Sequence, residues 1–235
     1  MRALLWLALA APAAAVPPKA PGGRVAEYET AARAFYKAGA FDLLGDLTLR
    51  SDRGEKLLTT GGYARLHRNL KVGAFYRLQQ GMRQDDDWQR RALSSTQWEW
   101  KDARRRFEHV AIADVTPRFA LGGPLVLFLK NQLHFNSYTR HSLYKAAPEL
   151  ACFFPRGVAY LRAEGDLALS RGAKELVDRW AYAGFLWRAT EQISVGPHAA
   201  LRDWVWRTSR HSPPADRYRV VHRSVVLGVT LLGRF

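Results

Sequence analysis

The sequence predicts an all-β fold, namely an up-and-down antiparallel transmembrane β-barrel of about ten strands that follows a short N-terminal helix. Three observations support this fold class. From about residue 42 the apolar residues recur with a period of two, short turns alternate with longer charged connections, and the strand-like segments are long. A typical soluble strand has about 5 to 6 residues, whereas a tilted strand that crosses a bilayer needs about 9 to 11.

Residues 1–15 have the features of a secretory signal peptide. Met1 and Arg2 form a short positive start, residues 3–11 are an apolar run, and residues 13–15 are a small-residue cleavage site. The run is too short to cross a bilayer as a helix. A buried apolar helix explains the charge and the cleavage site less well, so we expect export and leave this segment out of the fold.

Residues 16–41 are predicted to form a linker and a short helix. Residues 16–23 are rich in proline and glycine. Over 24–38, apolar residues recur at helical spacing: Val25, Tyr28, Ala32 and Phe35. Gly39 suits the C-terminal stop of a helix. We therefore place the start of the barrel at residue 42.

Ten strand-like segments occupy residues 42–235. They lie near 43–52, 57–67, 71–83, 107–120, 125–138, 144–154, 158–171, 180–189, 193–207 and 218–235. The alternation is clear over 125–138, where Leu125, Leu127 and Leu133 share one face and Lys130 and His134 the other. A membrane barrel turns the apolar face to lipid, whereas a soluble lipocalin-like barrel turns it inward. Alternation alone leaves both arrangements open.

The connections divide into two classes. Short turns are expected near 67–69, 122–124, 155–157 and 190–192, and longer charged loops near 84–106, 172–179 and 208–217. With an even strand count and both ends of the barrel in the periplasm, every short turn falls on the periplasmic side, as in bacterial barrels. Tryptophans near strand ends are expected at the two membrane interfaces: Trp88, Trp98, Trp100, Trp180, Trp187, Trp204 and Trp206.

The last segment, 218–235, has one nearly apolar face that ends in an aromatic residue. Its members are Val225, Leu227, Val229, Leu231, Gly233 and Phe235. This pattern resembles the terminal strand of bacterial outer-membrane barrels, which the barrel assembly machinery recognises. The resemblance implies location in the outer membrane of a Gram-negative cell, with Phe235 as the assembly signal.

A second resemblance covers roughly residues 60–235. Arg106-Phe-Glu108-His, Pro117-Arg118-Phe-Ala-Leu and the stretch LVLFLKNQLHFN at 125–136 resemble a family of small outer-membrane barrels of unknown function. That family usually has a glutamate where this chain has Gln132. The resemblance implies a membrane barrel and no defined activity.

Charge and cysteine content narrow the partners. The formal net charge is +15, and an exported protein with this excess is expected to meet anionic lipid or lipopolysaccharide rather than nucleic acid. A single cysteine, Cys152, excludes an intramolecular disulfide and a multi-cysteine metal site. We expect no metal and no cofactor. Five basic residues are expected either to contact lipopolysaccharide phosphates or to form a solvated loop: Arg90, Arg91, Arg104, Arg105 and Arg106.

Charged residues on the polar faces are expected to form a network in the lumen. The predicted members are Arg77, Glu108, Lys130, Arg162, Glu164, Asp166, Arg188 and Arg202, with Glu149 beside them. Such a network either sets the selectivity of a pore or fills a narrow barrel with structural ion pairs. The leading function is therefore non-catalytic, a structural or weakly pore-forming barrel with a small-solute role.

Two alternatives to this function remain. The first is a lipid-hydrolysing outer-membrane enzyme in which His222 activates Ser224, because positions i and i+2 of a strand share a face. His141 and Ser142 form a weaker pair. The second is a soluble periplasmic lipocalin-like binder.

Overall fold

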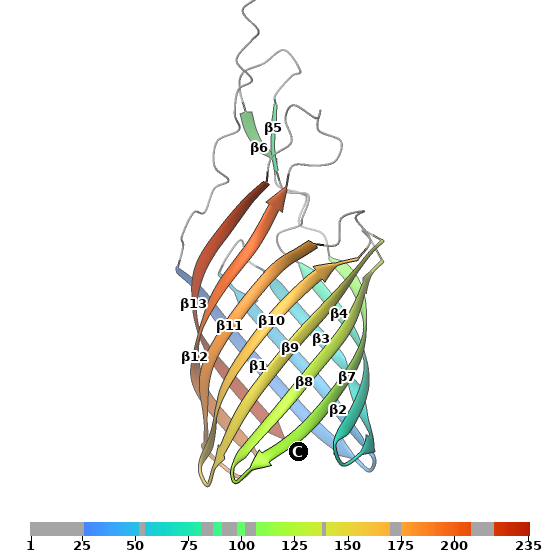
Figure 1. The fold of residues 1–235 in the computed structure, drawn as a ribbon, viewed down its shortest axis with the longest axis vertical. Coiled ribbons are helices and arrows are strands. Elements are labelled where there is room, and N and C mark those ends of the chain that lie inside the picture. The colour runs from blue at the N-terminus through green and yellow to red at the C-terminus, as the bar shows by residue number, and fades with distance from the viewer. Residues whose placement is uncertain are drawn as a thin grey trace, which may run out of the picture.

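The protein is a closed β-barrel of eleven strands in a computed structural model (Figure 1). The structure describes residues 26–51, 55–80, 87–90, 98–101, 107–137, 140–169, 175–207 and 219–235. The barrel strands are β1 (Ala26–Ala38), β2 (Phe41–Arg50), β3 (Lys56–His67), β4 (Leu70–Gln80), β7 (Glu108–Gly122), β8 (Leu125–Asn136), β9 (His141–Phe154), β10 (Gly157–Ala168), β11 (Glu175–Arg188), β12 (Ile193–Arg207) and β13 (Arg219–Arg234). Two four-residue strands, β5 (Asp87–Arg90) and β6 (Trp98–Lys101), form a separate hairpin.

Neighbouring barrel strands pair antiparallel, with one exception. β1 pairs antiparallel with β2 on one side and parallel with β13 on the other, over ten residue pairs from Ala26↔Val225 to Phe35↔Arg234. We call this β1–β13 junction the seam. Ten of the eleven strands coincide with the ten predicted segments, and β1 is the strand that the prediction missed.

The predicted helix over 24–38 is wrong, because residues 26–38 form β1. Burial alternates along it, with Glu27, Glu29 and Ala31 buried and Tyr28 63% exposed. The helical spacing of apolar residues misleads here because in this strand the buried side carries carboxylates. The backbone of β1 forms hydrogen bonds with a neighbouring strand on each side, whereas the backbone groups of a helix bond within the helix itself.

The even strand count is also wrong. Short turns at 39–40, 68–69, 123–124, 155–156 and 189–192 gather at one end of the barrel, here named the turn end, where β13 also finishes. The opposite end, where β2, β4, β8, β10 and β12 finish, is here named the loop end. Because β1 runs parallel to β13, its first residue, Ala26, lies at the loop end, whereas the last strand finishes with Arg234 at the turn end. The chain therefore enters and leaves the barrel at opposite ends.

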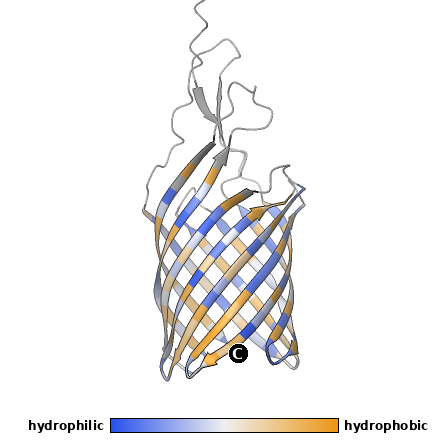
Figure 2. Cartoon of the chain, in the orientation of Figure 1, coloured by the Kyte–Doolittle hydropathy of each residue, from blue (hydrophilic) through white to orange (hydrophobic). Residues whose placement is uncertain are grey.

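The exterior of the barrel is apolar and the interior is polar. Exposed side chains on the outer face include Leu43, Leu161, Leu201 and Leu227, whereas buried side chains inside include Asp114 and His134. Figure 2 shows this alternation along the strands. This is the reverse of the arrangement that a lipocalin-like binder requires. In the described ranges, no helix is long and apolar enough to cross a membrane.

Aromatic residues mark the outer surface at the turn end. Tyr36, Phe41, Phe119, Trp187 and Phe235 are all between 46% and 58% exposed there. Of the tryptophans expected at the membrane interfaces, Trp187 lies on the outer face near the turn end, whereas Trp180 and Trp204 line the lumen; Trp180 is 4% exposed and stacks on Tyr182. The Trp180 ring also lies close to the guanidinium groups of two interior arginines, Arg50 and Arg202.

Candidate functional site in the lumen

A cavity of about 560 Å³ occupies the lumen. Its wall extends from Glu55, Asn136 and Trp204 near the loop end to Lys71 and Phe128 near the turn end. The cavity therefore runs along most of the barrel. Its size lies within the range of small-molecule sites.

The wall of the cavity is densely charged and formally balanced. Eight acidic residues line it: Glu29, Asp46, Glu55, Glu108, Glu149, Glu164, Asp166 and Asp178. Eight basic residues line it too: Arg33, Arg50, Lys71, Arg77, Lys130, Lys145, Arg162 and Arg202. Charges of one sign alone would be costly in a space this narrow, so the pairing of these groups decides which of them are available to a solute.

One ion-pair group bridges β9 and β10. Lys145 Nζ lies 2.8 Å from Glu164 and 3.3 Å from Asp166, and the Arg162 guanidinium lies 3.0 Å from Glu164 and 3.9 Å from Glu149. Arg162 also stacks 4.2 Å from the centre of the Tyr182 ring. Two cations thus hold three carboxylates, which leaves this side of the lumen slightly acidic.

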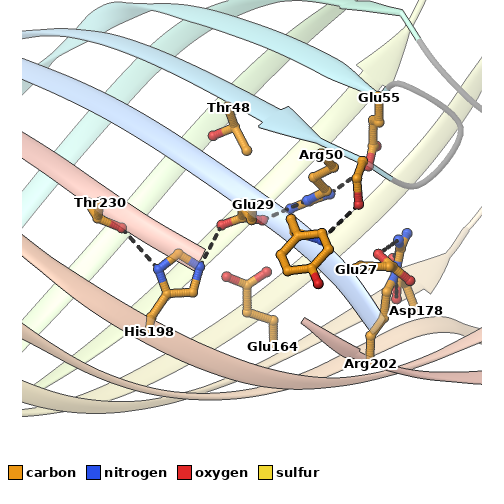
Figure 3. Close-up of polar contacts among 12 residues, drawn as sticks. Glu27, Glu29, Thr48, Arg50, Glu55, Glu164, Asp178, His198, Arg202 and Thr230 are labelled. Carbon is orange, nitrogen blue, oxygen red and sulfur yellow. Dashed lines mark hydrogen bonds and ion pairs between the residues drawn. The ribbon is translucent and has the colours of Figure 1, made fainter. Parts of the chain in front are cut away.

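A second group lies toward the loop end (Figure 3). Arg50 donates to Glu29 at 2.7 Å and to Glu55 at 2.8 Å, and Arg202 lies 3.0 Å from Asp178. Both guanidinium groups lie over the Trp180 ring, at 4.6 Å and 4.5 Å from its centre, as in cation–π interactions.

Glu55 lies at the loop-end mouth of the lumen. Burial alone would raise the pKa of the Glu55 carboxyl, but the attraction of Arg50 outweighs it and holds this pKa below its ordinary value. The group is therefore ionised at neutral pH and keeps Arg50 paired on two sides.

A third group is a hydroxyl–imidazole–carboxylate line at the seam. Thr230 Oγ1 is 3.2 Å from His198 Nδ1, and His198 Nε2 is 3.2 Å from Glu29 Oε1 (Figure 3). The order resembles a catalytic triad. However, neither Thr230 nor His198 lines the cavity, and the His198 side chain is only 2% exposed. A substrate in the cavity would not reach the hydroxyl, so the arrangement joins β12 and β13 to β1.

A fourth group surrounds Asp114 on β7. Its carboxylate accepts from Gln132 at 2.7 Å and from Thr116 at 2.6 Å, and Lys130 Nζ lies 3.7 Å away. Gln132 Oε1 in turn contacts His134 at 3.0 Å. The Gln132 amide can donate to Asp114, whereas a glutamate at this position would place two carboxylates side by side.

Arg77 differs from the other cations of the wall. Its Nε donates to Thr59 Oγ1 at 3.0 Å, and among the described residues no carboxylate lies within ion-pair distance of it. The other seven lining cations each have a carboxylate partner. Arg77 therefore presents a guanidinium charge to the lumen that no single side chain neutralises.

Seven of the eight predicted network residues line the cavity, and Arg188 does not. Arg188 is the last residue of β11 and is exposed at the turn end. Beyond these seven and Glu149, the wall carries eight charged residues that the prediction omits: Glu29, Arg33, Asp46, Arg50, Glu55, Lys71, Lys145 and Asp178. The prediction omits Glu29 and Arg33 because it assigns β1 to a helix; the alternation of Glu27, Glu29 and Arg33 with Tyr28 is the signal that indicates a strand.

The proposed catalytic pair lies on β13. Ser224 is buried, does not line the cavity and has an Oγ without a hydrogen-bond partner in the described structure. The backbone of His222 pairs with Trp204, and its side chain lies outside the description. The predicted lipopolysaccharide contacts Arg91, Arg104, Arg105 and Arg106 also lie outside the described residues, and of Arg90 only the backbone, in β5, is described. Among the described side chains, no group of three or more His, Cys, Asp or Glu could hold a metal ion.

No protein family, curated protein or solved structure matches this chain.

Proposed function

We propose that the chain is an outer-membrane β-barrel whose narrow, charge-lined lumen admits small polar solutes at low conductance. The observation that carries this proposal is the inverted distribution of side chains, with apolar residues exposed outside and ion pairs around a cavity inside. A surface of exposed leucines and valines would aggregate in water but is suited to lipid. A closed barrel also pairs its backbone groups internally, which a bilayer requires.

The height of the apolar band supports a membrane location. On β8, the exposed residues Leu125 and Phe135 are ten residues apart. A strand rises about 3.4 Å per residue, and a tilt of about 45° then gives roughly 24 Å along the barrel axis. This is close to the roughly 25 Å apolar band of outer-membrane barrels.

The lumen supports a weak pore better than a wide channel. Ion-paired side chains project from the wall, and the cavity between them has a volume of about 560 Å³, which is within the range of small-molecule sites. Insertion by the barrel assembly machinery, with the loop end toward lipopolysaccharide, belongs to the same proposal.

Two measurements test the proposal together. Membrane fractionation followed by electrophoresis with and without boiling should find the protein in the outer membrane, with a mobility that changes on boiling. Planar bilayers should then show small, discrete conductance steps. A soluble protein without a mobility shift would refute the membrane location, and a folded, inserted barrel without conductance would leave only the structural role.

The lipid-hydrolase alternative stays a prediction. It requires ester hydrolysis that Ser224→Ala abolishes while the barrel still shows its mobility shift on boiling. Retained hydrolysis in this variant would exclude Ser224 as the nucleophile.

A further inference from the structure

Seven basic residues surround the turn end of the barrel. Five stand at or near strand ends, namely Lys37, Arg65, Arg118, Arg188 and Arg234, and all five are exposed. Arg68 and Arg156 lie in two of the short turns and are also exposed. The acidic side chains at this end are Asp42 and Glu191, and Glu149 is level with Arg118, since both pair with Phe128. We call the seven basic residues the turn-end ring.

The strand register places the five strand-end members on the lumen side of the wall. Directly paired residues of neighbouring strands share a face. Arg118 is opposite Phe128 and Arg65 is opposite Lys71, and both partners line the cavity. Arg234 is level with Phe35, which also lines it.

The remaining two strand-end members follow the same rule. Lys37 is opposite Asp42, whose neighbour on β3 is the interior residue Tyr63. Arg188 is opposite Ser194, which in turn pairs with the buried Leu232. These five members of the ring therefore lie around the mouth of the lumen, just beyond the residues that line the cavity.

Most members of the ring have no protein partner for their charge. Arg65 lies 3.6 Å from Asp42, which Lys71 also contacts. For the side chains of the other six, the described part of the chain contains no ion pair and no hydrogen bond. Cations in a solvated mouth with low-dielectric walls raise the local concentration of anions, and rings of Arg or Lys are the device by which pores select anions.

We propose that the turn-end ring draws small anions with phosphate or carboxylate oxygens into the lumen, where Arg77, which has no carboxylate within ion-pair distance, is the next cation. This names the solute class of the proposed function and rests on it. The ring, rather than the balanced interior, then sets the preference, because the interior cations other than Arg77 are already held by carboxylates.

The experiment compares two variants with equal charge loss. The ring variant carries Lys37→Gln, Arg118→Gln, Arg188→Gln and Arg234→Gln. The control carries Lys56→Gln, Arg140→Gln, Arg179→Gln and Arg223→Gln, which removes one lysine and three arginines, all exposed, from the other end and its vicinity. The chloride-to-potassium permeability ratio is measured from reversal potentials in bilayers of uncharged phosphatidylcholine under a KCl gradient.

We expect wild type and control to prefer chloride, and the ring variant to lose at least about half of that preference. Conductance without anion preference, or an equal ratio in all three proteins, would overturn the inference and leave the proposed function intact. If none of the three proteins conducts, the proposed pore function is refuted, which is a different outcome from the loss of anion preference.

Binding in detergent then tests the ring without a pore. Inorganic pyrophosphate should bind wild type and control several-fold more tightly than the ring variant at low salt. Equal binding to all three proteins would overturn the inference. So would a defect of the ring variant that appears only on vesicles of anionic phospholipid, because the ring would then serve lipid headgroups.

Discussion

At the residue scale, the partners of each lumen charge decide what its removal does. Arg202 is 9% exposed, and its guanidinium lies 3.0 Å from the Asp178 carboxylate and 3.6 Å from the buried Glu27 carboxylate, so its loss removes a cation that two carboxylates share. Arg77 donates a hydrogen bond to a hydroxyl and has no carboxylate within ion-pair distance, so its loss breaks no direct ion pair. Two arginines that look alike in the sequence therefore have different roles.

Replacing each of these arginines with glutamine should separate stability from selectivity. We expect Arg202→Gln to lower the free energy of unfolding by about 3 kcal/mol and Arg77→Gln to lower it by less than about 1 kcal/mol. Arg77→Gln should instead move the permeability ratio toward potassium. Urea unfolding and reversal potentials measure the two effects, and a large stability loss in Arg77→Gln would show that the lumen holds a partner for this charge.

The pH dependence of stability should report Glu55. Because Arg50 holds the folded-state pKa of this carboxyl below its unfolded value, ionised Glu55 stabilises the protein above about pH 4.3, the ordinary glutamate pKa. This contribution disappears as the pH falls through the lower, folded-state pKa.

Glu55→Gln should therefore cost about 1 kcal/mol at pH 7 and progressively less below pH 4. Glu191→Gln, at an exposed turn residue, is the matched control and should cost nothing at either pH. Unfolding free energies at pH 7 and pH 3 measure both. A cost for Glu55→Gln that does not depend on pH would contradict the ion-pair explanation.

At the element scale, the seam depends on side chains that cross β13. His198 reaches Glu29 from β12 because the intervening residue of β13 is Gly228. A Cβ atom at Gly228 would lie 2.3 Å from His198 Nε2 and 2.7 Å from the Glu29 carbonyl oxygen. The single parallel junction of the barrel thus requires a small residue at this position.

Gly228→Ala should destabilise the barrel by about 1 to 3 kcal/mol through this overlap. Gly45→Ala is the control, since nothing lies within 4 Å of a Cβ atom there. The two variants are compared by heating samples to a series of temperatures and recording, by electrophoresis, the temperature at which the folded band is replaced by the unfolded band. Equal temperatures would show that the seam tolerates displacement of His198.

At the scale of the whole molecule, the apolar exterior predicts a depth-dependent cost for charge. Leu227 lies near the middle of β13 and is 48% exposed, whereas Leu66 lies beside the turn end and is 65% exposed. If the barrel spans a bilayer, Leu227→Arg should cost about 2 to 4 kcal/mol and Leu66→Arg about 1 kcal/mol or less. Unfolding from phospholipid vesicles measures both. Equal, near-zero costs would place both residues in water and refute the membrane location.

Local sequence determined much of this fold. Ten strands, their short turns and their polar faces follow from a period of two and from turn residues, which act over a few neighbours and therefore appear in the sequence itself. Eight of the sixteen cavity charges, among them Arg162 and Glu164, are predictable from the sequence because they share faces with other polar residues.

The tertiary structure alone decided the rest. Alternation is the same whether the apolar face points in or out, so only closure of the barrel showed that Leu227 is outside and Ser224 inside. Residues 26–38 form a strand because they pair with β13, about two hundred residues away in the chain, and no local sequence pattern encodes such a partner. For the same reason the pairing of Arg202 and the isolation of Arg77 appear only in the folded barrel, because strand register determines which charges meet.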